Sequence, residues 1–161
     1  MAYKSTVNIT RPANTTAYTA GDVIGNSTSA GGAVLALGTF GNSSGFAFIT
    51  GVTLRIDLTA IPSGMTSFRA HLYKSSPGSA LADNDAWDLP SGDRSAYLGY
   101  IDIGTPADVG STLFVQYDEV NKLIELNGSA PTTVYGYLVT NGGYTPTSGE
   151  TMQLTMGGIP L

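Results

Sequence analysis

The sequence predicts an all-β protein, an antiparallel β-sandwich of about eight to ten strands with at most one short helix. Two observations favour this fold class. Short stretches in which apolar and polar residues alternate recur along the chain, as in strands with one buried face. Among 161 residues there are 21 Gly, 20 Thr and 15 Ser but only 3 Lys and 3 Glu, a composition that suits turns and strands rather than helices.

The first half of the chain contains the clearest alternation. In residues 52–58 the apolar side chains Val52, Leu54 and Ile56 share one face, and polar residues occupy the other. The same period of two appears in residues 3–10 and in residues 68–73. Weaker patterns predict further strands at residues 18–25 and 33–40.

The second half is predicted to begin with the one helix, over residues 80–87, with Ser79 as its N-terminal cap. Strands are then expected at five places, and Asn127-Gly128 between two of them is typical of a tight hairpin turn. The five predicted strands are residues 97–103, 113–117, 123–126, 133–140 and 151–156.

These elements fit a single domain over residues 1–161, in which two antiparallel sheets pack face to face. A jelly-roll sandwich suits the number of strands, and an immunoglobulin-like sandwich fits the pattern nearly as well. Residues 157–161, Gly-Gly-Ile-Pro-Leu, form an apolar end that we expect either to pack on its own domain or to lie across a neighbouring subunit as an arm.

Charge excludes several classes of partner. The formal net charge is −5 and the seven basic residues are scattered, whereas nucleic-acid binding needs clustered Lys and Arg. No apolar run reaches the roughly 18 residues of a membrane-spanning helix. We therefore expect neither nucleic acid nor membrane as a partner.

Each candidate for catalysis or metal binding has a simpler structural interpretation. Residues 41–45 match the G-x-S-x-G pattern of a hydrolase nucleophile, but a strand-like run follows where that motif needs a helix. His71 is the only histidine, and a surface or inter-subunit position is expected for it. Residues 83–88 are acidic without calcium-loop spacing, so an acidic loop anchored by Trp87 is favoured over a calcium site. We expect no enzyme activity and no cofactor.

Several segments together resemble the capsid decoration, or cement, proteins of tailed bacteriophages. The resemblance spans roughly residues 10–117, and the matching sequence segments are typical of a family rather than of a catalytic site. The segments that carry it are residues 10–25, 48–54, 68–73, 81–87, 97–102 and 110–115.

The resemblance implies a jelly-roll protein on the outer surface of an icosahedral phage head, bound across subunits of the major capsid protein. It brings no catalytic, cofactor or metal residues with it. We expect a homo-oligomer, with a trimer favoured over a dimer. The interface residues that we predict are Ile159, Leu161, Arg69, His71 and Tyr73.

A second hypothesis is a phage tail or fibre module that binds host glycans. It requires an exposed platform of aromatic rings, for which Trp87, Tyr97 and Tyr100 are the candidates.

Overall fold

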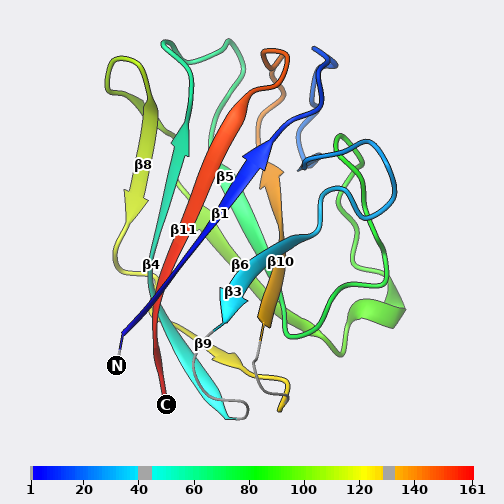
Figure 1. The fold of residues 1–161 in the computed structure, drawn as a ribbon, viewed down its shortest axis with the longest axis vertical. Helices are drawn as coiled ribbons and strands as arrows, with labels where there is room; N and C mark the ends of the chain where they lie inside the picture. Colours follow the sequence, from blue (N-terminus) through cyan, green and yellow to red (C-terminus); the bar gives the residue numbers. More distant parts are fainter. Residues whose placement is uncertain (1, 40–44, 129–132) are drawn as a thin grey trace.

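Two antiparallel sheets face each other in the computed structural model, which describes residues 2–39, 45–128 and 133–161 (Figure 1). The first sheet has the order β1-β11-β4-β8-β7, and β9 also pairs with β4. Its strands are β1 (Tyr3–Thr10), β4 (Phe46–Ile56), β7 (Ala107–Asp108), β8 (Leu113–Tyr117), β9 (Lys122–Glu125) and β11 (Thr151–Pro160).

The second sheet has the order β2-β10-β5-β6, with β3 also paired to β10. Its strands are β2 (Val23–Ile24), β3 (Leu35–Thr39), β5 (Phe68–Tyr73), β6 (Tyr97–Ile103) and β10 (Thr133–Thr140). The described residues thus hold eleven strands, and the chain passes repeatedly from one sheet to the other, as in a jelly-roll-like sandwich. The predicted β-sandwich is confirmed, with one short strand, β7, that the pattern did not indicate.

The core between the sheets follows the predicted alternation. On β4, Ala47, Ile49, Val52, Leu54 and Ile56 all point inward and are buried. The alternating residues of β5 and β11 that were predicted to be buried also lie in this core. Burying aliphatic side chains on both inner faces supplies the main stabilising free energy of such a sandwich, about 1.5–3 kcal/mol for each fully buried side chain.

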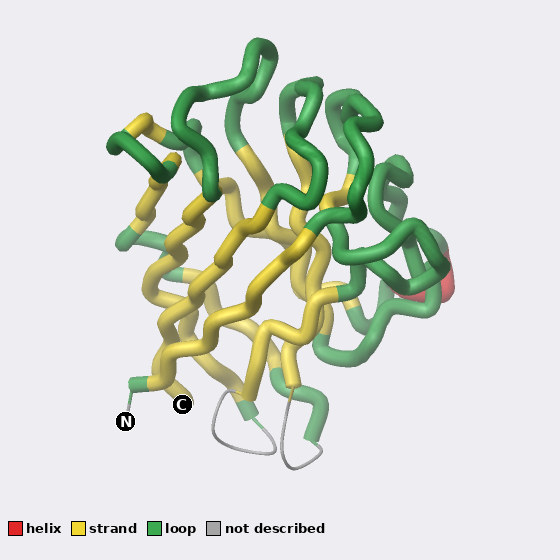
Figure 2. Tube along the Cα trace, turned by 45° about the horizontal axis from the view of Figure 1, so that its top comes forward, coloured by secondary structure: helices red, strands yellow, loops and turns green. Residues whose placement is uncertain are grey.

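The predicted helix over residues 80–87 is wrong. This segment forms turns in which Ala80 and Asn84 have φ values of 47° and 71°. The only helical element of the described residues is a 3₁₀ turn, η1 (Ser91–Asp93). Positive φ at two positions breaks a right-handed helix, and residues 74–96 instead lie over the outer face of the second sheet, at the right of Figure 2.

Topology decides two further features. Asn127-Gly128 does not close a hairpin, because β9 pairs with β4 in the first sheet whereas β10 belongs to the second sheet. Of the two arrangements expected for the apolar end, residues 157–160 adopt the first and pack on their own domain, since β11 continues through Pro160, which lies opposite Ala47 of β4. The chain ends beside the N-terminus, because β1 pairs along β11 (Figure 1).

Strand β3 of the second sheet comes into close contact with β1 of the first sheet. Gly38 of β3 has a φ of +91°, and a β-carbon at this position would overlap the side chain of Ser5 on β1. Only glycine satisfies both conditions, so this residue allows the two strands to close one side of the sandwich.

Replacing Gly38 by alanine should therefore lower the free energy of unfolding by about 2 kcal/mol, since overpacking adds to the cost of a positive φ. Urea unfolding of the variant would measure it. Gly31→Ala is the matched control, because Gly31 has a φ of +80° but open space around it. If the two variants lose equal stability, the overlap with Ser5 adds nothing to the loss of stability in Gly38→Ala.

Candidate binding surfaces

The outer face of the second sheet carries three of the predicted interface residues. Arg69, His71 and Tyr73 do share one face of β5, as the alternation indicates. The segment 74–96 covers most of that face, however, so Tyr73 is fully buried and His71 is 3% exposed. Arg69 stays partly accessible and pairs with Asp102 at 2.7 Å. His71 and Tyr73 are thus packed within their own chain and offer no surface to a partner.

Trp87 anchors the covering segment on His71. The two rings stack with centroids 3.7 Å apart, and the Trp87 ring nitrogen donates to the Tyr73 hydroxyl at 3.2 Å. His71 Nδ1 lies 2.8 Å from the Tyr97 hydroxyl. Burial lowers the pKa of His71 to about 4, and burial raises the pKa of Tyr73 to about 12. Both groups are neutral at pH 7 and serve packing.

The aromatic platform that the glycan hypothesis requires is not formed as predicted. Trp87 and Tyr97 are half-buried in the layer around His71. Tyr100 is the one member of the predicted set that is well exposed. Its ring lies beneath the Arg69 guanidinium and 5.8 Å from the His71 ring, and Tyr100 also lines a groove along the free edge of β6.

The acidic segment 83–88 supplies a buried ion pair. Asp83 accepts a hydrogen bond from Arg11 Nη2 at 3.1 Å, from the Tyr18 hydroxyl at 2.6 Å and from the Gly25 amide at 2.9 Å. Arg11 is 2% exposed, and its Nε donates to the Tyr18 hydroxyl. Burial alone would lower the pKa of Arg11, but Tyr18 and Asp83 raise it above its usual value. This network joins the end of β1 to the covering segment.

A second buried carboxylate lies nearby. Glu150 accepts a hydrogen bond from the Tyr144 hydroxyl at 3.0 Å and from the Thr147 amide at 3.2 Å. Burial raises its pKa, and the hydrogen bonds from Thr147 and Tyr144 offset part of that shift. The Tyr144 ring lies 5.3 Å from that of Tyr18, so both carboxylates belong to one packed region. No local sequence pattern indicates this packed region, because Arg11, Asp83 and Glu150 are far apart in the sequence.

The described residues contain no group of three or more side chains that could hold a metal ion. Residues 41–44 of the G-x-S-x-G pattern lie outside the described ranges, and the run that follows them is strand β4. Within the part of the chain that the structure describes, no helix is long and apolar enough to cross a membrane.

An exposed apolar surface, here called the end patch, lies on the outer face of the first sheet near the C-terminus. Strand register builds it, because Phe48 of β4 lies opposite Leu123 of β9 on one side and Ile159 of β11 on the other. Phe46 and Leu161 continue it, with the Leu161 amide donating to the Phe46 carbonyl at 2.9 Å. Leu123, Ile159 and Leu161 are all exposed.

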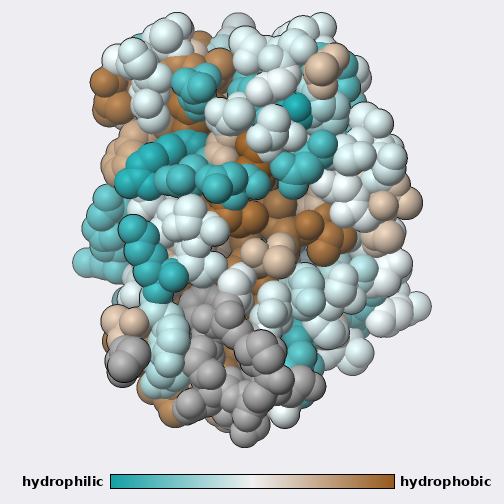
Figure 3. All heavy atoms as spheres, viewed as in Figure 1, coloured by the Kyte–Doolittle hydropathy of each residue, from teal (hydrophilic) through white to brown (hydrophobic). Residues whose placement is uncertain are grey.

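The end patch contrasts with the rest of this outer face. Farther along the same strands the neighbours are hydroxyl, amide and charged groups, such as Thr6 with Thr155 and Arg55 with Gln153. Figure 3 shows hydrophilic residues on the left of this view and a small area of hydrophobic colour at the lower edge, where the C-terminus lies, besides a larger hydrophobic area in the middle. Contiguous exposed apolar side chains of this kind are typical of protein–protein contact sites.

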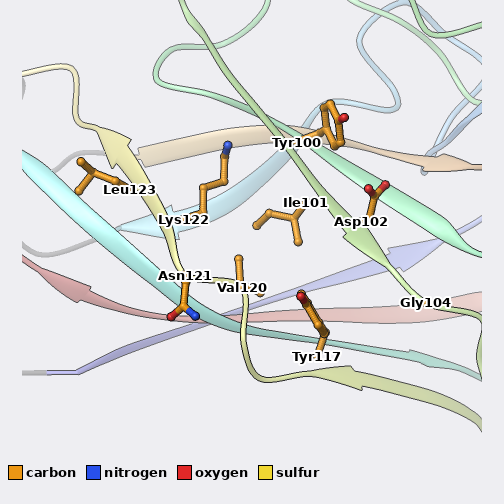
Figure 4. A pocket seen from close by; sticks show the side chains of 9 residues that line it. All are labelled: Tyr100, Ile101, Asp102, Gly104, Tyr117, Val120, Asn121, Lys122 and Leu123. Atoms are coloured by element: carbon orange, nitrogen blue, oxygen red, sulfur yellow. The ribbon is translucent and has the colours of Figure 1, made fainter.

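A groove of about 670 Å³, here called the side groove, lies between β6 and the segment that joins β8 to β9. Ile101 and Val120 point into it, and Tyr100 and Tyr117 stand on its two sides (Figure 4). The groove marks the open side of the sandwich, because β6 is the last strand of its sheet. Asp102, Gly104, Asn121, Lys122 and Leu123 complete its lining.

Comparisons with known proteins show neither a family nor a curated relative. No family model matches the sequence, and no curated protein matches it. A chain in the capsid of Ralstonia phage GP4 is similar over 100% of this chain and 84% of its own, with 12% identity and a TM-score of 0.43.

Two other solved structures are similar to a comparable extent. A chain of the cyanophage Pam1 capsid asymmetric unit has 14% identity over 99% of this chain and 85% of its own, with a TM-score of 0.37. A bacterial lipoprotein from Bacteroides thetaiotaomicron has 10% identity over 96% of this chain and 83% of its own, with a TM-score of 0.33. Likenesses of this size do not establish a common family.

Proposed function

We propose that this chain is a virion structural protein that decorates and stabilises the outside of an icosahedral phage head by binding across major capsid subunits. The observation that carries the proposal is the end patch. It presents aromatic and aliphatic side chains on the outer face of a sheet, where a protein partner can cover them and exclude water.

Other features of the chain support a binding role without chemistry. The carboxylates and the histidine that are buried are all engaged in packing or hydrogen bonds within the chain. The resemblance of residues 10–117 to capsid decoration proteins points to the same role. Of the predicted interface residues, Ile159 and Leu161 belong to the end patch, and we propose them as contacts with the capsid.

The proposal is tested by binding to purified phage heads that lack this protein, measured by co-sedimentation. Ile159→Asp places a charge in the end patch, beside Phe48, and should weaken binding at least about tenfold, since burying an unpaired charge at an interface opposes association. Val109→Asp is the matched control, because Val109 is exposed and apolar but lies beyond β7, away from the patch.

Loss of binding in both variants, or in neither, would show that the end patch is not the contact surface. No binding of the unaltered protein to heads would reject the proposed function itself. We also propose a homo-oligomer, a trimer rather than a dimer, and light scattering of the purified protein measures its mass directly.

A further inference from the structure

The Tyr100 ring is held in place although it is 47% exposed. The Arg69 guanidinium lies over this ring at 4.0 Å from its centroid, and Asp102 fixes Arg69 by a 2.7 Å ion pair. Arg69 belongs to β5, on the opposite side of β6 from the side groove, so the support comes from behind. A rigid surface aromatic binds a ligand with little loss of side-chain entropy.

The side groove collects polar groups that have no partner within the described protein. The hydroxyls of Tyr100 and Tyr117, the Asn121 amide and the Lys122 ammonium make no hydrogen bond or ion pair there, although the described ion pairs engage Arg69 and Lys74 near by. Donors and acceptors therefore stand beside an apolar floor of Ile101 and Val120. Binding sites of 300–1,000 Å³ with this mixture are typical of small organic ligands.

Lys122 gives the groove its charge. The Lys122 Nζ lies 2.8 Å from the position that a β-carbon of Gly99 would take, so the ammonium occupies the space of the missing side chain beside β6. Asp102, the carboxylate of the lining, is engaged by Arg69. The unpaired charge in the groove is thus positive in a chain whose net charge is −5.

We propose that the side groove binds an acidic oligosaccharide. A sugar ring offers an apolar C–H face to a tyrosine ring and hydroxyls to the surrounding phenol and amide groups. A carboxylate on the sugar pairs with Lys122. The site is separate from the binding surface of the proposed function, apart from Leu123 at its border, and stands whether or not the chain binds a phage head.

Addition of a peptide strand to β6 is the competing use of this groove, and the structure favours it less. Gly99 has a φ of +90°, and the register of β6 against β5 shifts next to it, between Leu72 and Tyr73. Such irregularities blunt an edge for pairing with another strand. The regular edge that remains is residues 100–103.

The test is a glycan array probed with the full chain, followed by calorimetric titration with trigalacturonic acid and with its methyl ester. The unaltered protein should bind acidic glycans on the array and bind the acid about tenfold more tightly than the ester, because one charge-assisted contact is lost in the ester. Lys122→Met should remove that preference and leave binding of the ester unchanged.

Tyr100→Ala should weaken binding of both sugars about tenfold, because the stacking ring is lost. Phe46→Ala is the matched control, since Phe46 is 48% exposed and lies in the end patch rather than the groove. Thermal unfolding of each variant verifies that it is folded. The proposal is overturned if no glycan on the array is bound, if Tyr100→Ala binds as well as the unaltered protein, or if an extended valine-threonine peptide binds in place of the sugars.

Discussion

Replacing Asp83 by alanine should lower the free energy of unfolding by about 3–5 kcal/mol, the cost of leaving a buried cation without its counterion. Arg11 is 2% exposed and has Asp83 as its ion-pair partner. The substitution also removes the acceptor of the Tyr18 hydroxyl and of the Gly25 amide. Urea unfolding followed by far-ultraviolet circular dichroism measures the change.

The double variant Arg11→Met with Asp83→Leu separates the ion pair from the packing around it. Removing both charges leaves no uncompensated ion, so the double variant should be more stable than Asp83→Ala alone. The Gly25 amide and the Tyr18 hydroxyl still lose their acceptor, which limits how much stability the double variant regains. A single-variant loss below about 1 kcal/mol would mean that water reaches Arg11 and that the network is not a structural anchor.

Acidification from pH 6.5 to pH 4 should destabilise the fold by up to about 3 kcal/mol through His71 alone. Burial lowers its pKa from 6.5 in the unfolded chain to about 4 in the folded protein. Between these two values the unfolded chain binds the proton and the folded protein does not. His71 therefore leaves the free energy of unfolding undiminished above pH 6.5. That free energy falls as the pH decreases from 6.5 towards 4.

The His71→Gln variant isolates this effect, because it removes the only histidine while the carboxylates keep their own pH dependence. The variant should be less stable at pH 7, where the stacking of His71 on Trp87 is lost. The gap to the unaltered protein should narrow as the pH falls, which unfolding curves at four or five pH values would reveal. A gap that is constant with pH would show that His71 takes up its proton in the folded state.

Glu150 acts in the opposite direction. Its raised pKa means that the folded protein holds the proton more tightly than the unfolded chain does, so its contribution to stability falls as the pH rises through that pKa. The two buried groups partly cancel in the unaltered protein. The comparison with His71→Gln removes this ambiguity, since Glu150 is present in both chains.

Alternation of apolar and polar residues carried most of the fold prediction. Strands β1, β5, β6, β8 and β10 have the bounds that the pattern indicates. Alternating burial is seen in β1 and β6, whereas β5 and β10 are buried on nearly all sides because residues 74–96 cover their outer face. The run after residue 45 was expected to be strand-like, and it joins residues 52–56 in one long strand, β4, whereas the continuation of β11 to Pro160 was not indicated. In both places apolar side chains stand on the outer face, and this departure from alternation is what forms the end patch.

The candidate surfaces were harder to predict than the strands. Ile159 and Leu161 were expected at an interface from their apolar character alone, and the register against Phe46 and Phe48 now shows their neighbours. His71 and Tyr73 were assigned to the same surface on the evidence of a shared strand face. Local pattern cannot show that the segment 74–96 folds over that face.

The sequence by itself determined the class of the protein, since strand period, turn residues and the scarcity of Lys and Glu are local properties. Tertiary structure decided which faces stay open. Arg11 meets Asp83, Phe48 meets Leu123 and Ile159, and Tyr100 comes to stand across a groove from Tyr117. Each of these contacts joins residues at least seventeen positions apart, and their meeting depends on which strands become neighbours rather than on any pattern within one strand.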